Sequence, residues 1–333
     1  CRDCYKCIRH CPVKAIRFSM GHAEIIDERC IKDGRCVLVC PQNAKIIQND
    51  CGTVKTFIQN KEFVVASLAP SFVAAFSDVA PGQLFKALKS LGFSVVRETA
   101  EAAELVAIAH ARLLEEGKGG LITSSCPAVN ALIYKYYPQH IPSLAPVVSP
   151  MVAHARLLKK EFEGLDPRVV FIGPCIAKKA EREEVEITGE VDIAMTFDEL
   201  KEWFNQENII PSQFPLERED LPSVQWARAF PVEGGLLKTG DLDTGILSRE
   251  TVVITGIDRC QRFLDNFEKE KEGLKLIEMM SCEGGCIDGP LLKSPLSLYQ
   301  RRKRIIEFAQ QGTGSKEKQK IIELPSLMRE FQP

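Results

Sequence analysis

The chain has 333 residues, of which 45% are hydrophobic and 26% are charged, and its formal net charge is −2. This composition is typical of a globular protein that is long enough for two domains. A general nucleic-acid-binding protein needs a basic surface, so the nearly balanced charge argues against that class. No apolar run reaches the roughly 18 residues that a membrane span requires.

Thirteen cysteines carry most of the information in the sequence, and seven of them lie within the first 40 residues. A chain of this length can bury a core without disulfides. The spacing of the cysteines therefore favours thiolates that bind metal in a reducing compartment. We expect a cytoplasmic protein.

The first four cysteines follow the C-x2-C-x2-C-x3-C-P pattern of iron–sulfur proteins. Thiolates two residues apart can wrap one corner of a cubane, and the fourth cysteine of such a run binds a second cluster. A zinc site needs no run of this kind, so we expect iron–sulfur clusters. Residues 1–50 also contain too little apolar material for a core, so metal would have to hold them together.

The second cysteine block departs from this pattern, because Asp33 stands where its second cysteine should be. A carboxylate can bind iron, although it exchanges more readily than a thiolate. Three outcomes are open: a 4Fe–4S cluster with Asp33 as a ligand, a three-iron cluster, or replacement of the missing ligand by Cys51. We favour an unligated Cys51. By resemblance to two-cluster ferredoxins, one cluster is held by Cys1, Cys4, Cys7 and Cys40, and the other by Cys11, Cys30, Cys36 and Asp33.

From residue 61 onward, strand and helix patterns alternate. The alternation predicts an α/β domain with a largely parallel sheet. Glu101 and Glu104 are expected on a solvated helix face. In chain order the expected elements are strand 61–68, helix 82–91, helix 100–116, strand 120–123, helix 150–163, strand 168–172, helix 197–205, strand 251–254 and helix 258–270.

Three further cysteine motifs lie where a strand should end, the usual position of sites in an open α/β sheet. They read TSSCPA at 123–128, GPCIAKKAE at 173–181 and MMSCEGGCIDG at 279–289. Four thiolates from these motifs would complete another 4Fe–4S site. Lys178 needs a partner if it is buried, and a bound anion would supply one. The four cysteines are Cys126, Cys175, Cys282 and Cys286.

In the order and spacing of these motifs, the chain resembles the FeFe hydrogenases across essentially its whole length. The corresponding family signatures are T-S-C-C-P, P-C-x-x-K-K-x-E and M-x-C-x-G-G-C. The resemblance implies that the four cysteines hold the cubane of the H-cluster and that Cys286 also bridges to a diiron unit carrying CO, cyanide and a dithiolate. It implies that Lys178 donates a hydrogen bond to a cyanide. The lining positions that it implies are Ala69, Pro70, Ser71, Pro150, Phe230 and Met280.

Several positions differ from family members that turn over rapidly. Ser125 replaces a cysteine that passes protons, and a serine hydroxyl does not ionise in the range where a thiol titrates. Residues 109–110 lack the acidic groups of the usual proton pathway, and Gly173 replaces a methionine. Glu233 stands at a position usually held by a small hydroxyl residue and is the best substitute proton carrier, with Glu283 a weaker one. These features resemble the hydrogen-sensing branches of the family.

The leading prediction is therefore an enzyme, an FeFe hydrogenase that is slow and senses hydrogen. The alternative is a hydrogenase-like iron–sulfur assembly or scaffold protein without the diiron site. Lys178, Met280 and the 69–71 loop favour the hydrogenase. The expected partners are hydrogen and protons, a redox or signalling protein and the diiron maturation machinery, with no nucleic acid and no membrane.

This prediction divides the chain into three parts. Residues 1–55 are expected to form a ferredoxin-like α+β domain with two clusters, and residues 56–325 the H-cluster domain with parallel-sheet layers. Residues 326–333 are expected to be a C-terminal tail. The polar run at 311–320 is typical of a linker.

Overall fold

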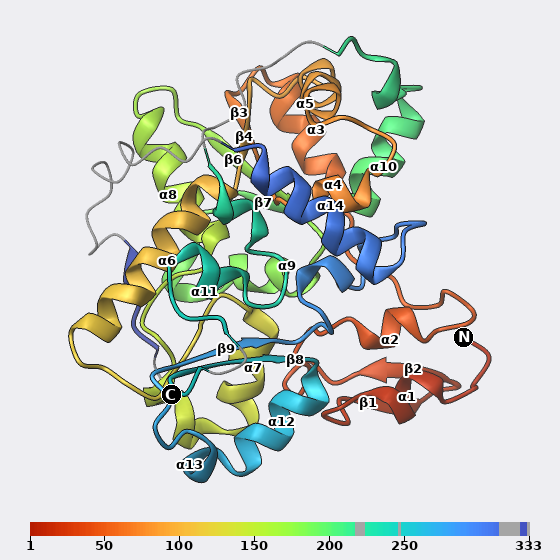
Figure 1. Cartoon of the computed structure of the whole chain (residues 1–333). Coiled ribbons are helices and arrows are strands. Elements are labelled where there is room, and N and C mark those ends of the chain that lie inside the picture. The colour runs from red at the N-terminus through yellow and green to blue at the C-terminus, as the bar shows by residue number, and fades with distance from the viewer. Residues whose placement is uncertain (217–223, 246–247, 313–326, 332–333) are drawn as a thin grey trace.

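The computed structural model describes residues 1–216, 224–245, 248–312 and 327–331. They form two separate parallel sheets and one antiparallel hairpin, with helices around them (Figure 1). The predicted α/β class is confirmed. The strands are β1 (Ile16–Ser19), β2 (His22–Ile25), β3 (Val64–Leu68), β4 (Val95–Glu98), β5 (Leu121–Ile122), β6 (Arg168–Gly173), β7 (Ile193–Thr196), β8 (Thr251–Thr255) and β9 (Leu276–Met280).

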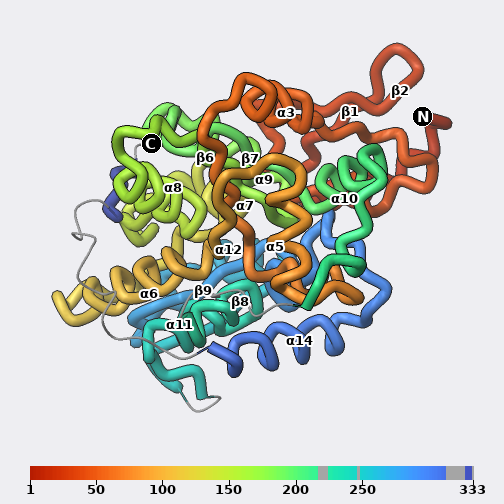
Figure 2. The backbone as a smooth tube through the Cα atoms, turned by 90° about the horizontal axis from the view of Figure 1, so that it is seen from above, coloured from red at the N-terminus to blue at the C-terminus, as the bar shows by residue number. Residues whose placement is uncertain are grey.

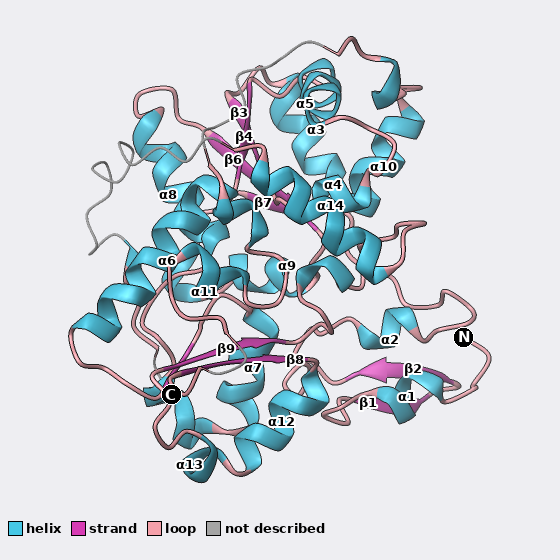
Figure 3. Cartoon of the chain, viewed as in Figure 1, coloured by secondary structure: helices cyan, strands magenta, loops and turns pink. Residues whose placement is uncertain are grey.

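The larger sheet has four parallel strands in the order β4-β3-β6-β7. Every residue of β3 is buried, as expected for a central strand that helices cover on both faces. Figure 3 shows helices on both sides of this sheet. The longer helices are α3 (Cys51–Gln59), α5 (Pro81–Ser90), α6 (Ala100–Glu115), α7 (Pro127–Tyr136), α8 (Pro150–Glu161), α10 (Phe197–Gln206), α12 (Ile257–Asp265) and α14 (Leu298–Gln310).

The smaller sheet has three parallel strands in the order β5-β9-β8. It lies in the lower part of the molecule in Figure 1, and α9 lies between it and the larger sheet. Because β5, β6 and β9 each lead directly into a cysteine motif, the carboxyl ends of both sheets contribute to one region. The shorter helices are α1 (Lys6–His10), α2 (Arg35–Leu38), α4 (Phe72–Ala75), α9 (Ala177–Arg182), α11 (Gly235–Thr239) and α13 (Phe267–Glu270).

The amino-terminal residues project from one side of the molecule (Figure 2) but have no separate core. Their buried side chains, such as Ile16 and Ile31, belong to one apolar cluster with Ile122, Leu132 and Ile133. As their composition predicts, residues 1–50 do not form a core of their own. Packing against α7 and the smaller sheet supplies the apolar contacts that the segment lacks by itself.

Most predicted elements form within a few residues of their expected bounds. The helix expected at 258–270 is interrupted at Asn266, so it forms α12 and α13. Glu101 is wrongly expected to face solvent: it is buried and pairs with Arg97. The part of the expected linker that follows residue 312 lies outside the described residues. None of the helices in the described part of the chain combines the length and apolar composition needed to span a bilayer.

A fully buried ion pair joins β4 to the short 3-10 helix Trp226–Ala229, and its arginine also contacts α14. Arg228 donates from Nη2 and Nε to the two carboxylate oxygens of Glu98, at 2.6 and 2.8 Å. Its guanidinium lies 4.1 Å from the ring centroid of Phe308 in α14. Both charged side chains are essentially inaccessible to water, so each depends on the other for its compensation.

We predict that Arg228→Met destabilises the protein by about 3–5 kcal/mol, because it leaves the Glu98 carboxylate buried without a cation. The matched control is Arg17→Met, which removes a solvent-exposed pair with Glu24 and should leave the stability close to that of the parent. Denaturant unfolding of both variants at equal iron content measures the difference. Equal losses for the two variants would contradict the prediction.

Candidate functional site

The four cysteines of the large domain reach their positions from three strand ends. Cys126 directly precedes α7, whose first residue is a proline, a residue that suits the first helical position because its ring fixes φ. Cys175 follows β6, and the remaining two cysteines follow β9. Between those two, Gly285 has φ +93°, and a Cβ there would lie 2.4 Å from the carbonyl oxygen of Pro231. Only glycine allows this close approach of two backbones.

These four cysteines line one cavity, so the structure brings together the residues that the sequence separates by up to 160 positions. The cavity also contains Lys178 and Met280, as the sequence predicts. Its wall is completed by residues of the cysteine motifs and by two residues of the amino-terminal segment. The lining residues are Lys32, Asp33, Ser125, Cys126, Pro127, Ala128, Pro174, Cys175, Lys178, Met280, Ser281, Cys282, Cys286, Gly289 and Pro290.

Burial and mutual repulsion disfavour the thiolate form of Cys175, Cys282 and Cys286. Burial, followed by the charge of Cys126, raises the pKa of Cys175 to about 11. Burial together with Cys126 and Cys175 raises the pKa of Cys286 to about 12, and the pKa of Cys282 is also raised. Positive metal would reverse this balance, because coordination deprotonates a thiol. Four thiols around one cavity fit a 4Fe–4S cubane. Within the described ranges, no three His, Cys, Asp or Glu side chains are grouped to hold a single metal ion.

Lys178 has a protein partner. Its Nζ donates to Glu181 Oε2 at 2.6 Å and to the carbonyl oxygen of Ser125 at 3.4 Å. The fully buried Glu181 carboxylate, one helical turn away, is thus a partner of Lys178 besides the bound anion that the sequence leads us to expect. The ammonium retains donor capacity for a ligand in the cavity, since it has three N–H groups.

Three buried hydroxyls near these motifs have no hydrogen-bond partner in the described structure. They are the Oγ atoms of Ser71, Ser125 and Ser149. Buried hydroxyls are normally paired, so unpaired ones indicate space for an acceptor that is supplied by a bound group. Of the three, Ser125 lines the thiol cavity, so its hydroxyl fits an acceptor bound there. Ser149, which precedes Pro150, was missed in the sequence, although a Ser-Pro pair at a helix start is visible there.

The other predicted lining residues are near but do not border the thiol cavity. Ala69, Pro70, Ser71 and Pro150 are buried, and Phe230 is partly buried. A Cβ on Gly173 would lie 2.6 Å from the ring of Phe171 and 3.2 Å from the Cβ of Ala69. The Phe171 ring thus fills the space of the missing side chain, and Ala69 of the 69–71 loop lies beside the second cysteine motif.

Glu233 does not line the cavity. Its side chain is exposed, so the expectation that it faces the diiron pocket is wrong. The physical reason is a β-bridge between Val232 and Gly285, which fixes this segment by its backbone and turns the next side chain outward. Glu283 is exposed as well.

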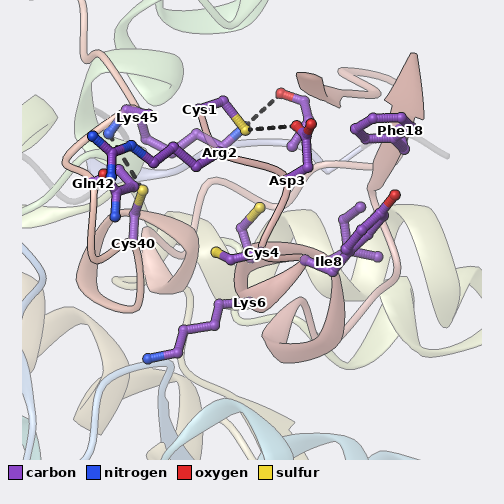
Figure 4. A pocket seen from close by; sticks show the side chains of 14 residues that line it. Cys1, Arg2, Asp3, Cys4, Lys6, Ile8, Phe18, Cys40, Gln42 and Lys45 are labelled. Carbon is purple, nitrogen blue, oxygen red and sulfur yellow. Dashed lines mark hydrogen bonds between the residues drawn. The ribbon is translucent and has the colours of Figure 1, made fainter. Parts of the chain in front are cut away.

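The first amino-terminal site brings together the predicted set Cys1, Cys4, Cys7 and Cys40. In Figure 4 the sulfur atoms of Cys1, Cys4 and Cys40 lie around the same open centre. Cys40 accepts a hydrogen bond from the backbone N–H of Ala44 at 3.3 Å, and this contact lowers its pKa. Backbone N–H groups that donate to sulfur stabilise a thiolate ligand.

The second amino-terminal site contains Cys30, Asp33 and Cys36 around a cavity of about 220 Å³. Burial raises the pKa of Cys36 to about 11, with further contributions from Asp33, Cys30 and Cys11. Cys11 is therefore within electrostatic range of the other three. The Oδ2 atom of Asp33 is buried without a hydrogen-bond partner, as expected of an oxygen that awaits a metal.

Cys51 lies in a different environment. It is the first residue of α3, and its thiol donates to the carbonyl oxygen of Glu199 at 3.5 Å. Burial raises its pKa to about 12, and Glu199 adds to the effect. Cys51 is not among the residues that line the cavity of Cys30, Asp33 and Cys36.

Asp33 and Lys32 border both this second cavity and the thiol cavity of the large domain. Gly34, the next residue, has φ +76° and packs between Ile176 and Pro290. The loop that carries the aspartate is thus inserted between two cysteine motifs of the large domain. This position cannot be read from the local sequence, because it depends on contacts with residues more than 140 positions away.

Two family models match this chain. The 4Fe-4S dicluster domain matches residues 1–48, and the iron only hydrogenase large subunit, C-terminal domain, matches residues 62–290. The NADP-reducing hydrogenase subunit HndD of Solidesulfovibrio fructosivorans is 27% identical over 94% of this chain, which spans 64% of that subunit. The periplasmic Fe hydrogenase large subunit of Nitratidesulfovibrio vulgaris is 26% identical over 90% of this chain and 87% of its own length.

Solved structures show the same fold. A variant of the FeFe-hydrogenase HydA1 from Chlamydomonas reinhardtii superposes with a TM-score of 0.62 at 19% identity. The superposition covers 78% of this chain and 88% of that one. Identity this low supports the fold alone.

We predict that Gly34→Ala weakens the packing of the loop that carries Asp33 against Ile176 and Pro290. A Cβ there would lie 2.5 Å from Pro290 and 2.8 Å from Ile176, so neighbouring atoms must move. Gly21→Ala is the matched control, because Gly21 has φ +79° and no atom within 4 Å of such a Cβ. In both variants the left-handed backbone should lower the free energy of unfolding by about 1 kcal/mol. The steric overlap in Gly34→Ala should lower it by about 1–3 kcal/mol more.

Denaturant unfolding and the iron content of each variant test this prediction. Gly34→Ala should bind less iron than Gly21→Ala, because the second site borders the displaced loop. Equal stability and equal iron content in the two variants would contradict it.

Proposed function

Because this chain belongs to the iron-only hydrogenase large-subunit family, we propose that it interconverts protons plus electrons and molecular hydrogen at an H-cluster. The observation that supports this proposal is the single cavity shared by four thiols and Lys178. When bound, the H-cluster supplies the redox-active iron centre at which hydrogen is made or split. The chain supplies the side chains that hold the cluster, the contacts that orient it and the groups that carry protons to it.

In this proposal Cys126, Cys175, Cys282 and Cys286 hold the cubane, and Cys286 also binds the diiron unit. Lys178 donates to a cyanide while Glu181 keeps the ammonium charged and oriented. The 69–71 loop, Pro150, Phe230 and Met280 enclose the diiron unit. Ser125 replaces the usual proton-passing thiol, and its hydroxyl can donate a hydrogen bond but does not titrate near neutral pH.

The amino-terminal segment carries iron–sulfur clusters, which we propose conduct electrons to the large domain. One cluster is held by Cys1, Cys4, Cys7 and Cys40. The other is held by Cys11, Cys30, Cys36 and Asp33, and the unpartnered buried oxygen of Asp33 supports its role as the fourth ligand. The proposed domain bounds remain 1–55 and 56–325, with a tail at 326–333.

We further propose that turnover is slow and serves hydrogen sensing. Ser125 removes the thiol relay, and the fully buried His110 and His154 cannot replace it, because burial lowers the pKa of both to about 4. The partner would then be a redox or signalling protein, and diiron maturation proteins would supply the cofactor. All the cysteines are free thiols, which suits the reducing cytoplasm.

Infrared spectroscopy of the protein matured with the diiron unit tests the proposal. A hydrogenase should show intrinsic CO and cyanide bands, and these bands should shift under hydrogen. A scaffold protein that holds only cubanes should show none. Hydrogen evolution from a reduced dye, measured on the same sample, then gives the rate.

We predict that Asp33→Ala converts the second amino-terminal cluster to a three-iron form, so that one iron per chain is lost. Asp33→Cys should retain four irons and shift the potential of that cluster, because a thiolate replaces a harder ligand. Cys51→Ala is the control and should bind the same iron as the parent. Iron analysis and electron paramagnetic resonance measure both effects. Loss of the cluster in Cys51→Ala but not in Asp33→Ala would reverse the assignment.

We predict that Lys178→Ala blocks stable insertion of the diiron unit and leaves the cubane, so that two irons per chain are missing after maturation. Because Lys178→Ala also leaves the Glu181 carboxylate buried without its cation, the control is a double variant, Lys178→Met with Glu181→Gln, which removes both charges of the pair. Both should lack the cyanide bands if the lysine acts directly on the cofactor. Normal bands in the double variant would assign Lys178 a purely structural role.

A further inference from the structure

A buried carboxylate in the smaller sheet is absent from every ligand set described above. Glu278 lies in β9, the central strand of that sheet, and is 2% exposed. The other residues of β9 are apolar, and β5 and β8 contribute no titratable side chains. A carboxylate in such a strand is costly unless it is hydrogen-bonded or protonated.

The hydrogen-bond partners of Glu278 come from the backbone of the segment that contains Glu233. Leu237 N–H donates to Glu278 Oε2 at 3.2 Å, and the N–H groups of Gly234 and Leu236 also interact with the carboxylate. The charged side chain that acts most on Glu278, in the part of the chain that the structure describes, is the carboxylate of Glu233. Lys238, on the same short helix, is exposed and lies over the ring of Trp226.

Glu278 lies on the same face of β9 as Met280, because side chains alternate along a strand, and Met280 lines the thiol cavity. The charge of exposed Glu233 acts on Glu278, and the charge of Glu278 acts on Cys286, which also lines the cavity. The β-bridge between Val232 and Gly285 joins the segment that carries Glu233 to the loop that ends in Cys286.

We propose that Glu278 is a proton-relay residue that receives protons from Glu233 at the surface and delivers them towards the cavity beside Cys286. The inference rests on the proposed hydrogenase function. Each step moves one proton between carboxyl groups, so no electron or other atom is transferred. The return step reverses the order when hydrogen is oxidised.

The protonation behaviour of Glu278 suits this role. Burial raises its pKa to about 7, the backbone N–H groups oppose the rise, and the charge of Glu233 adds to it. A relay group works best when its pKa is near the working pH, since it then gains and loses protons with equal ease. His110 and His154 are buried too, but their lowered pKa keeps them neutral at that pH.

A merely structural Glu278 would tie α11 to β9, and Glu278→Gln preserves that role because the amide oxygen still accepts from Leu237 N–H. The first measurement is an infrared pH titration of protein that carries its iron–sulfur clusters but no diiron unit. A carboxylic-acid band should titrate near pH ~7. It should be absent in Glu278→Gln and present in Glu233→Gln and Glu283→Gln.

The second measurement is hydrogen turnover of matured protein. Glu278→Gln should reduce it by at least about tenfold, with unchanged CO and cyanide bands, because a lost proton relay typically costs 10²-fold or more. Glu233→Gln should reduce it less, and Glu283→Gln should match the parent. A missing carboxyl band, or full turnover in Glu278→Gln, overturns the relay.

The two measurements separate this inference from the proposed function. If the parent protein turns over no hydrogen, both the proposed function and the relay are ruled out, but the infrared titration still reports the protonation of Glu278. If the parent is active and Glu278→Gln is equally active, only the relay is ruled out. Equal losses in Glu283→Gln and Glu278→Gln would also overturn it, because the exposed glutamate borders the same loop.

Discussion

Four cysteine side chains from three loops share one buried cavity, and their sulfur atoms repel one another once ionised. Burial and neighbouring sulfurs raise the pKa of Cys175 to about 11 and that of Cys286 to about 12. Only positively charged metal makes four thiolates favourable there. The loops must therefore be held in place by the ends of β5, β6 and β9, whose parallel pairing is independent of the metal. The two sheets provide this frame.

Two helices connect the cavity to the amino-terminal segment. Cys126 precedes α7, and at the other end of that helix Lys135 donates to the carbonyl oxygen of Cys30 at 2.8 Å. Short α9 places Lys178 on the thiol cavity and Lys179 on the second amino-terminal cavity. Lys179 also pairs with Asp50 and Glu199, and so ties the two parts of the chain together. The amino-terminal cysteine sites and the thiol cavity thus share α7 and α9 as common elements.

Side-chain burial is where the folded chain departs most from its sequence pattern. The pattern places Glu233 in the pocket and Glu101 in solvent, and the structure reverses both. A local pattern cannot show that a β-bridge fixes the backbone beside Glu233, or that Arg97 covers Glu101. Glu278 was missed for the same reason. A charged residue within an apolar strand was the available signal, but its meaning depends on a segment about 40 residues earlier in the chain.

The spacing of the cysteines and the alternation of strands and helices can be read from the order of residues, because they depend on covalent distance and on periodic burial along one element. The packing of the folded chain adds that Asp33 borders both cavities, that Glu181 pairs with Lys178, and that buried Glu278 lies on the same face of β9 as Met280, which lines the thiol cavity. Those relations arise where segments from different sheets pack together. Such packing follows from the shape and burial of many residues at once, so no single motif contains it.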